Sequence, residues 1–209
     1  MEEENETYFL EESLFRIGRL LGLCFGQAGA KIIGLNISTA DSGVDFNPKL
    51  HGEFVEGIYG YCNIRNFTDV CIALQSKIML FVNQIADIVH SQVDIYNGIP
   101  NKNIGDAFLL VWIIPTREDL VDLDIEKTIV NASSIADLSV TSAFKIYAKV
   151  SAYNHIREYR HHPELLKFNP EYRVELGFGL HYGWAIQGAF GSQWKIDASY
   201  LSPNILISK

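Results

Sequence analysis

Apolar and polar positions alternate along the chain with two different periods, and the shorter period predicts strands. Residues 53–64, EFVEGIYGYCNI, are rich in apolar and aromatic side chains and predict a central strand. Residues 93–114, VDIYNGIPNKNIGDAFLLVWII, hold two apolar runs and predict two strands joined by a tight turn. Residues 173–192 predict two further strands around glycine-rich bends, and KIDASYLSPNILIS (195–208) closes the chain.

The longer period predicts helices. Residues 67–96 carry one apolar face, and Thr68 or Asp69 is the expected N-cap of this first long helix. Residues 132–159 predict a second long helix. Residues 8–24 predict an amphipathic lead-in helix or a short coiled segment. The apolar face of the first long helix comprises Val70, Leu74, Ile78, Phe81, Ile85 and Ile88.

Polar stretches separate these elements and predict loops at 36–52, 115–128 and 161–172. The remaining order, β-α-β-β-α-β, indicates an α+β fold of the split βαβ, ferredoxin-like type, with helices packed on one side of a mixed sheet. We expect residues 1–53 to form a helical lead-in and linker, and residues 54–209 to form one domain.

Composition narrows the class of protein. The chain has 209 residues, which can bury a full core, and its net charge of −8 argues against nucleic acid or an anionic membrane as the main partner. The start, MEEENETYFLEES, is acidic and unlike a signal or transit peptide, and no apolar run reaches the length of a membrane span. Cys24, Cys62 and Cys71 lack metal-ligand spacing, so we expect reduced, buried thiols in a cytosolic protein.

Two polar residues lie in apolar surroundings and are candidates for chemistry. Asn63, within GYCNIRNFTD, is either a structural side chain or the neutral remnant of a metal-binding carboxylate. Asp106 follows a glycine in NKNIGDAFLLVW and is either a solvated turn residue or an exposed catalytic carboxylate. The turn after Asn63 opens a helix, whose first N–H groups can bind phosphate, and a nearby carboxylate can bind Mg²⁺. The pattern indicates a nucleoside triphosphate with a metal, but spacing alone leaves the alternatives open.

Four ordered motifs resemble the class III nucleotidyl cyclases, the catalytic domain shared by adenylate and guanylate cyclases. YCNIRNFTD resembles the first metal strand of that family, and NKNIGDAFLL resembles its second metal hairpin. GFGLHYGWAIQGAFGS resembles the Gly-Ile-His-x-Gly strand with the Gly-x-x-Gly that follows. KIDASYLSPNI resembles the purine and ribose strand in its protist and algal form. The resemblance spans about residues 54–209, and we expect this cyclase homology domain to be truncated at its C-terminal end.

The resemblance implies a head-to-tail dimer with active sites at the interface. One subunit supplies two aspartates that hold two Mg²⁺ or Mn²⁺ ions, and the ions activate the ribose hydroxyl and clamp the triphosphate. The other subunit supplies a Lys and an Asp that read adenine, and an Asn and an Arg that act on the ribose and the transition state. ATP, a divalent metal and a second cyclase-type domain are therefore the expected ligands and partner.

The resemblance assigns the metal and phosphate side as follows. Asp106 matches the second metal aspartate, and Asn63 stands where the first is expected. Ile64 would offer its backbone carbonyl to a metal. The residues of the following turn that would face the phosphates are Asn66, Phe67 and Thr68.

On the base and ribose side, Lys102 stands where adenylate cyclases have Lys and guanylate cyclases have Glu. Asp197 matches the adenine-reading acid, although strict counting from the ribose strand gives Ser199 instead. Leu206 replaces the catalytic Asn, and the transition-state Arg would lie beyond the last residue.

These replacements predict an adenylate cyclase-type domain, converting ATP to cyclic AMP and pyrophosphate at the family level, whose own catalysis is impaired. Asn63 is neutral and Leu206 cannot form a hydrogen bond. The alternative is a non-catalytic pseudocyclase that acts as a structural or dimerisation module, so whether this chain is an enzyme (a phosphorus-oxygen lyase) stays open. Because a homodimer would carry both defects in each site, we expect a heterodimer. The large side chains expected at its surface are Phe108, Trp112, Tyr182, Trp184 and Phe190.

Other polar and aromatic groups have simpler expected roles. We expect solvated imidazoles at His161 and His162, a packed or hydrogen-bonded imidazole at His181, and a solvated acidic loop at 119–126. Phe178 and Trp194 are expected in the core or at the dimer surface. We expect a cytoplasmic location, and the resemblance to protist cyclases adds a ciliary or axonemal location as a second option.

Overall fold

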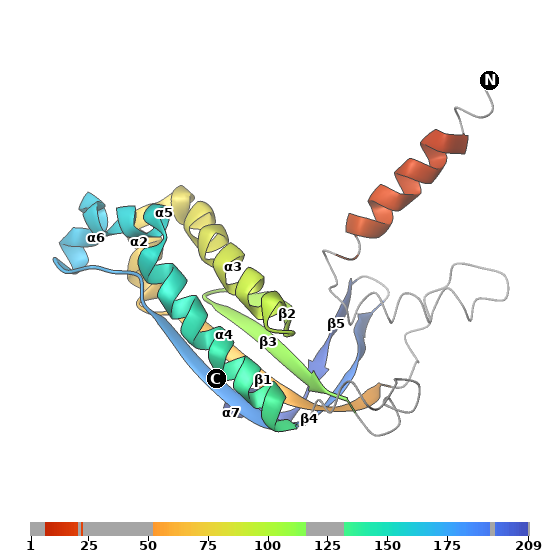
Figure 1. Cartoon of the computed structure of the whole chain (residues 1–209). Helices are drawn as coiled ribbons and strands as arrows, with labels where there is room; N and C mark the ends of the chain where they lie inside the picture. Colours follow the sequence, from red (N-terminus) through yellow and green to blue (C-terminus); the bar gives the residue numbers. More distant parts are fainter. Residues whose placement is uncertain (1–6, 21, 23–51, 116–131, 193–194, 209) are drawn as a thin grey trace. The chain divides into compact units, whose positions relative to one another are not determined.

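The computed structural model describes residues 7–20, 22, 52–115, 132–192 and 195–208 (Figure 1). The chain divides into two compact units. The smaller unit combines Met1–Glu53 with Ile186–Leu201, and the larger unit combines Phe54–Ala185 with Ser202–Lys209. The predicted loop at 36–52 and the predicted acidic loop at 119–126 lie outside the described residues, except for Gly52.

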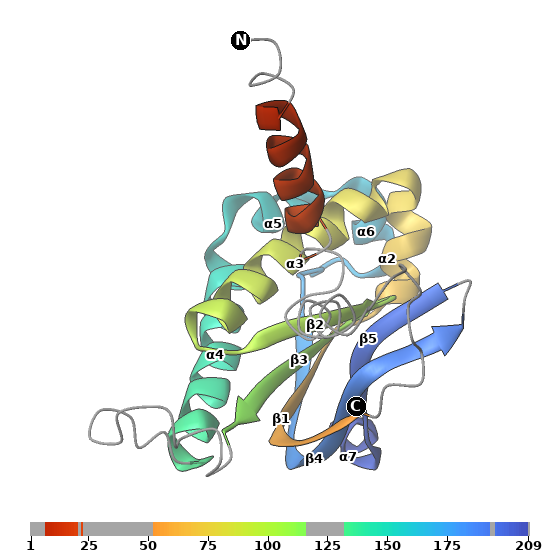
Figure 2. The ribbon, with the colours of Figure 1, turned by 90° about the vertical axis from the view of Figure 1, so that its right-hand side faces the viewer.

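The larger unit is built on an antiparallel ladder in which β3 (Ala107–Ile114) lies between two other strands (Figure 2). β1 (Glu53–Ile64) pairs with one side of β3, and β2 (Ile99–Ile104) pairs with the other. Because both are antiparallel to β3, β1 and β2 run in the same direction, as a split βαβ unit requires. In hydrogen-bonded order the strands run β2-β3-β1-β4-β5, which confirms the expected α+β fold and the central place of β1. The two remaining strands are β4 (Leu176–Ser192) and β5 (Lys195–Leu201).

Within the larger unit, helices pack on β2 and β3. α3 (Ile78–Ile95) contacts β2, α4 (Ala132–Ala152) contacts β3, and the two helices contact each other (Figure 1). The core is continuous from strands to helices because alternate residues of each strand point to the same face. Among the buried side chains of this core are Ile58, Cys62, Phe108, Leu110 and Trp112 from the strands, and Phe81, Ile85, Val89, Ile146 and Val150 from the helices. Phe108 and Trp112 are therefore core residues, and their expected place at a dimer surface is wrong.

The first long helix is broken, contrary to the expectation of one helix over 67–96. α2 (Phe67–Leu74) ends at Gln75, whose φ of 49° is incompatible with a continuing helix, and a 3₁₀ turn, η1 (Gln75–Lys77), leads into α3. The expected N-cap at Thr68 or Asp69 is also wrong. Asn66 takes that place with a φ of 55° and no side-chain capping bond, because Asn tolerates the left-handed turn that redirects the chain from β1.

The segment Phe67–Ile95 is the one part of the described chain that is long and apolar enough to cross a membrane by length and composition. Its side chains Phe81, Ile85 and Val89 are completely buried in the core of the larger unit.

The second long helix also ends earlier than expected. α4 stops at Ala152 because Tyr153 is extended, with a ψ of 120°, and two short elements follow, α5 (Asn154–Glu158) and η2 (Tyr159–His161). The predicted loop at 161–172 contains a helix, α6 (Pro163–Phe168). Proline at the first helical position favours this start, since its missing N–H is not needed there.

The glycine-rich stretch is a single strand, β4, of 17 residues, where two strands around bends were expected. The glycines do not bend the strand. Their missing Cβ atoms allow other parts of the chain to approach β4 closely. A Cβ on Gly179 would overlap the backbone carbonyl of Ser208, and a Cβ on Gly183 would overlap the side chain of Asn204. The C-terminal segment, which includes α7 (Pro203–Ile207), therefore lies directly against β4.

The smaller unit contains a helix over residues 7–20 and a β-hairpin. In the hairpin the end of β4 pairs antiparallel with β5, so that Phe190 lies opposite Asp197 and Gly188 opposite Ser199. The helix confirms the predicted lead-in helix. Its large apolar side chains are more than half exposed: Tyr8, Phe9, Leu10, Leu14, Phe15, Ile17 and Leu20.

Candidate functional site

The two positions that the sequence singles out lie next to each other at one end of the β1–β3 ladder. Asn63 is opposite Ala107, and the backbone amide of Ile64 donates a hydrogen bond of 2.8 Å to the carbonyl oxygen of Asp106. The bond joins the end of β1 to the turn between β2 and β3. Strand register alone therefore brings Asn63, Ile64 and Asp106 together.

Asp106 is half-buried and belongs to a two-residue turn whose first member, Gly105, has a φ of 62°. Glycine adopts this conformation without strain. On α2, burial and then the nearby Asp106 carboxylate raise the pKa of the Cys71 thiol. Asp106 is therefore close enough to α2 for its charge to act on Cys71, and it is not a fully solvated turn residue.

The amide of Asn63 lies against β4, beside a cation that the sequence analysis did not single out. A Cβ built on Gly177 would overlap Oδ1 of Asn63 and would lie 2.9 Å from Nη2 of Arg65. The backbone amide of Arg65 donates a hydrogen bond of 2.9 Å to the carbonyl of Glu175, which fixes this part of the chain on β4. The one available signal was the position of Arg65, two residues after Asn63, but spacing could not show that both side chains reach the same glycine.

The turn after Arg65 leaves backbone donors at the start of α2. The amides of Asp69 and Val70 donate to the carbonyl of Asn66, at 3.1 and 3.2 Å. The amides of Phe67 and Thr68 come before these bonds, in the part of a helix that has no intrahelical acceptor. Thr68 is exposed, and Phe67 packs partly against the core. Phosphate contact at Asn66, Phe67 and Thr68 stays a prediction.

The residues at this end of the ladder do not fit a pair of divalent cations. Asp106 is a carboxylate, but Asn63 is a neutral amide and Arg65 brings a positive charge to the same place. Over the residues that the structure describes, no group of three or more His, Cys, Asp or Glu side chains could hold a metal ion. Mg²⁺ and Mn²⁺ prefer carboxylate and other oxygen ligands, and two such ions need more negative charge than one carboxylate supplies.

The predicted base-reading residues lie in different units. Lys102 is half-buried on β2 of the larger unit, opposite Leu109 and next to a bulge in the β2–β3 ladder. Asp197 is half-buried on β5 of the smaller unit, and Ser199 is buried two residues further on. Residues two apart on a strand share a face, so both remain candidates for the predicted acid.

Leu206 is 73% exposed on α7 and offers no polar group. The nearest asparagine on this helix, Asn204, is already used to hold the C-terminal segment on β4. Its amide donates to the carbonyl of Trp184 at 3.0 Å, and its Oδ1 lies 3.2 Å from Nε2 of His181. The expected hydrogen-bonded role of His181 is confirmed, and Asn204 is not free to replace the missing catalytic Asn.

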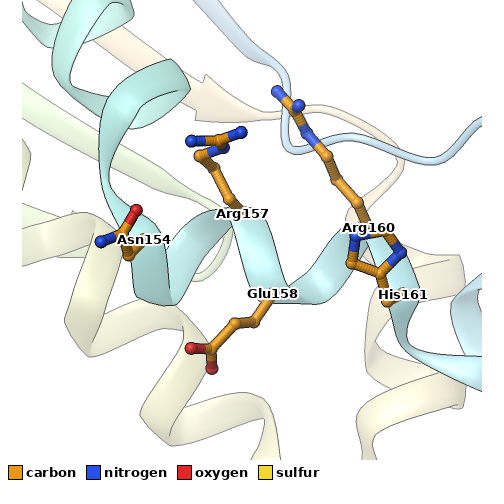
Figure 3. A pocket seen from close by; sticks show the side chains of 5 residues that line it. All are labelled: Asn154, Arg157, Glu158, Arg160 and His161. Carbon is orange, nitrogen blue, oxygen red and sulfur yellow. The ribbon is translucent and has the colours of Figure 1, made fainter.

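A separate pocket of about 370 Å³ lies on α5 and η2 (Figure 3). Arg157 and Arg160 extend on one side of this helical segment and Glu158 on the other. The pocket lining contains two arginines and one glutamate, and it shares no residue with the end of the β1–β3 ladder. The lining residues are Asn154, Arg157, Glu158, Arg160 and His161.

The two loop histidines differ from one another. His161 is exposed, as expected, but Nδ1 of His162 is buried and has no hydrogen-bond partner among the described residues. Solvation of His162 is therefore incomplete.

Comparison with known proteins gives three findings. No curated protein matches the sequence. Residues 1–38 match the family described as the all-helical domain of RasGEFs. Solved structures match over much more of the chain. A bacterial light-regulated adenylyl cyclase covers 98% of this chain at 19% identity with a TM-score of 0.65, and this chain spans 50% of that protein.

Two further structures agree with this match. The catalytic core of a rhodopsin-guanylyl cyclase with converted specificity, in complex with ATPαS, covers 75% of this chain at 15% identity with a TM-score of 0.53, and 71% of its own length is matched. The adenylyl cyclase CyaB from P. aeruginosa covers 76% at 14% identity with a TM-score of 0.54, and 71% of its length is matched. The chain therefore has the fold of the class III nucleotidyl cyclase catalytic domains, as its motifs predicted.

Proposed function

We propose that this chain is an adenylyl cyclase-type domain of cyclic-nucleotide signalling that does not turn over ATP by itself and acts by pairing with another cyclase-type domain. One observation carries the proposal: Asn63 occupies the end of β1 beside Asp106, where the resemblance requires a second carboxylate. The fold alone does not decide between an enzyme and a pseudoenzyme, since function depends on the site.

The lost carboxylate weakens the metal half of the site. Two divalent cations held by one carboxylate keep much of their charge uncompensated, and Arg65 adds to that charge. The loss amounts to several kcal/mol of transition-state stabilisation, on the order of a metal's Lewis-acid contribution.

Leu206 weakens the other half of the site independently. An oriented hydrogen-bond donor contributes roughly 10²–10³ in rate, and a leucine side chain cannot donate. Asn204 does not compensate, because its amide is bonded to Trp184 and His181. In a self-dimer each composite site would carry both defects, whereas a better-equipped partner could supply the metal carboxylates to one site.

Exposed aromatic side chains support a pairing surface. In the larger unit Tyr182 is 56% exposed and Trp184 is 43% exposed, although the ring of Trp184 stacks on Phe54. In the smaller unit Phe190 is 40% exposed. Apolar side chains that stay exposed in one chain are typical of interfaces. A purely structural pairing module is therefore the second candidate function.

A cyclic-nucleotide assay on the purified chain tests the proposal. ATP is supplied with Mg²⁺ in one series and Mn²⁺ in another, and cyclic AMP is measured by mass spectrometry. We expect no product above a boiled control in either series. Native mass measurement of the same sample, and of a mixture with a catalytically competent cyclase domain, tests the pairing. Robust cyclic AMP production by the unmodified chain contradicts the loss of turnover, and a stable monomer in every mixture contradicts the pairing.

A further inference from the structure

The end of the β1–β3 ladder contains a cation of its own. The guanidinium of Arg65 and the amide oxygen of Asn63 both occupy the space that a Cβ on residue 177 would fill, so any residue larger than Gly177 would displace them. Within the described part of the chain, neither side chain has a hydrogen bond or an ion pair with another residue. The positive charge of Arg65 is therefore not neutralised by a described carboxylate.

This arrangement changes what the site can bind. With a carboxylate at position 63, a guanidinium so close would form an ion pair, and the pair would leave little net charge. With the neutral Asn63 the guanidinium keeps its full charge, and a divalent cation placed against Oδ1 of Asn63 would be repelled by it. The same charge attracts phosphate, for which the planar guanidinium is well suited because it can donate two parallel hydrogen bonds.

We propose that the guanidinium of Arg65 takes the place of the divalent metal at this end of the ladder, so that the domain binds the triphosphate of ATP without magnesium. The inference rests on the proposed function, in that it assumes that this face still receives a nucleotide. It goes beyond loss of turnover, since a domain that has only lost a metal ligand would bind nucleotide weakly and would still depend on the metal.

The direct test is the affinity of the 209-residue chain for ATP, measured by titration calorimetry with EDTA in excess and again with Mg²⁺ in excess over the nucleotide. We expect binding in EDTA that is at least as tight as binding with magnesium, because Mg²⁺ neutralises part of the charge that Arg65 would attract. Binding that requires magnesium overturns the inference and leaves the proposed function intact.

Two variants separate Arg65 from general surface charge. Arg65→Gln should weaken binding in EDTA by about ten- to hundredfold, the range expected when a charge-assisted hydrogen bond is lost. Arg157→Gln is the matched control, because Arg157 is an exposed arginine on α5 outside this site. It should leave the affinity unchanged. An equal loss in both variants, with each shown to be folded by circular dichroism, contradicts a specific role of Arg65.

The double variant Asn63→Asp/Arg65→Gln is the converse test and needs no nucleotide. We expect it to bind Mn²⁺ in a saturable way by electron paramagnetic resonance, while the unmodified chain does not, since only the double variant offers a second carboxylate at the end of β1 without a neighbouring guanidinium. Saturable Mn²⁺ binding by the unmodified chain overturns the inference. Absence of ATP binding under every condition also overturns it, whereas the pairing proposed above is judged by native mass and is unaffected.

Discussion

The backbone amide of Ile64 donates a 2.8 Å hydrogen bond to the carbonyl of Asp106, and this bond holds the end of β1 on the β2–β3 turn. It involves no side chain of Asn63 or Asp106. Conservative substitutions at these two positions should therefore leave the ladder in place, and their effects report on local chemistry instead of on folding.

Asn63→Asp alone should not give cyclic AMP production. The substitution restores a carboxylate next to Asp106, but Leu206 still offers no hydrogen bond on the ribose side, where a missing donor costs roughly 10²–10³ in rate. The measurement is cyclic AMP formed from ATP with Mn²⁺ by the variant and by the unmodified chain. Turnover in the single variant would show that Leu206 is not a catalytic defect.

Asp106→Asn should make the thiol of Cys71 more reactive. Burial and then the Asp106 carboxylate raise the pKa of Cys71, and the substitution removes the second cause. A lower pKa gives more thiolate at any pH below it, and the thiolate is the reactive form. The rate of alkylation by iodoacetamide at pH 8 should therefore rise, and the profile of rate against pH should shift toward lower pH.

The other cysteines provide the controls for this experiment. Cys62 is completely buried and burial strongly raises its pKa, so it should not react in the folded chain. Replacement of Cys24 by Ser removes the third thiol. If Asp106→Asn leaves the alkylation rate and its pH profile unchanged in this background, then the charge of Asp106 does not act on Cys71.

The sequence predicted the strands of the larger unit because apolar runs and the Gly-Asp turn are local signals. It predicted α3 well, but it missed the break at Gln75, since the apolar face of 67–96 continues through the break without interruption. It also placed Phe108 and Trp112 at a surface. Burial of these rings depends on α3 and α4, which come from distant parts of the chain.

The sequence predicted those parts of the candidate site that depend on local spacing and missed those that depend on distant parts of the chain. Motif spacing identified Asn63 and Asp106, and their adjacency follows from register. Arg65 was missed because its relation to Asn63 depends on Gly177, more than a hundred residues away in sequence. The glycines of β4 were interpreted as bends because nothing local shows that the C-terminal segment needs their missing Cβ atoms.

Two alanine substitutions on β4 should have different consequences. In Gly179→Ala the new methyl group would overlap the backbone carbonyl of Ser208, so the C-terminal segment must move away from β4. In Gly177→Ala it would meet the ends of the Asn63 and Arg65 side chains, which can rotate. We expect Gly179→Ala to lower the free energy of unfolding by about 1–3 kcal/mol, as overpacking does, and Gly177→Ala to lower it less. Urea unfolding measures both, and the reverse order would contradict the contacts described.

The contact between α3 and η2 should contribute strongly to stability. Phe81 is completely buried, and its ring meets the ring of Tyr159 edge to face at 4.8 Å. Phe81→Ala should lower the free energy of unfolding by about 3–5 kcal/mol through lost burial and a cavity. Tyr159→Phe keeps the ring contact and removes only the 3.0 Å bond from the hydroxyl to Gln84, so it should cost about 1 kcal/mol. Equal losses in the two variants would show that the burial of Phe81 and its ring contact together contribute no more than the hydrogen bond of Tyr159.

Nucleotide choice should depend on Lys102. An ammonium group can donate a hydrogen bond to N1 of adenine. Guanine presents an N–H at that position, which cannot accept a hydrogen bond from the lysine. Lys102 is half-buried on β2, so its charge is less screened than that of a fully exposed lysine. We expect ATP to bind more tightly than GTP, and Lys102→Glu to weaken ATP binding by about ten- to hundredfold while favouring GTP.

Lys145→Glu is the matched control, because Lys145 is exposed on α4 and the change in charge is the same. Equal affinity for the two nucleotides, unchanged in Lys102→Glu, would show that Lys102 does not read the base, and an equal loss in both variants would show that only net charge matters.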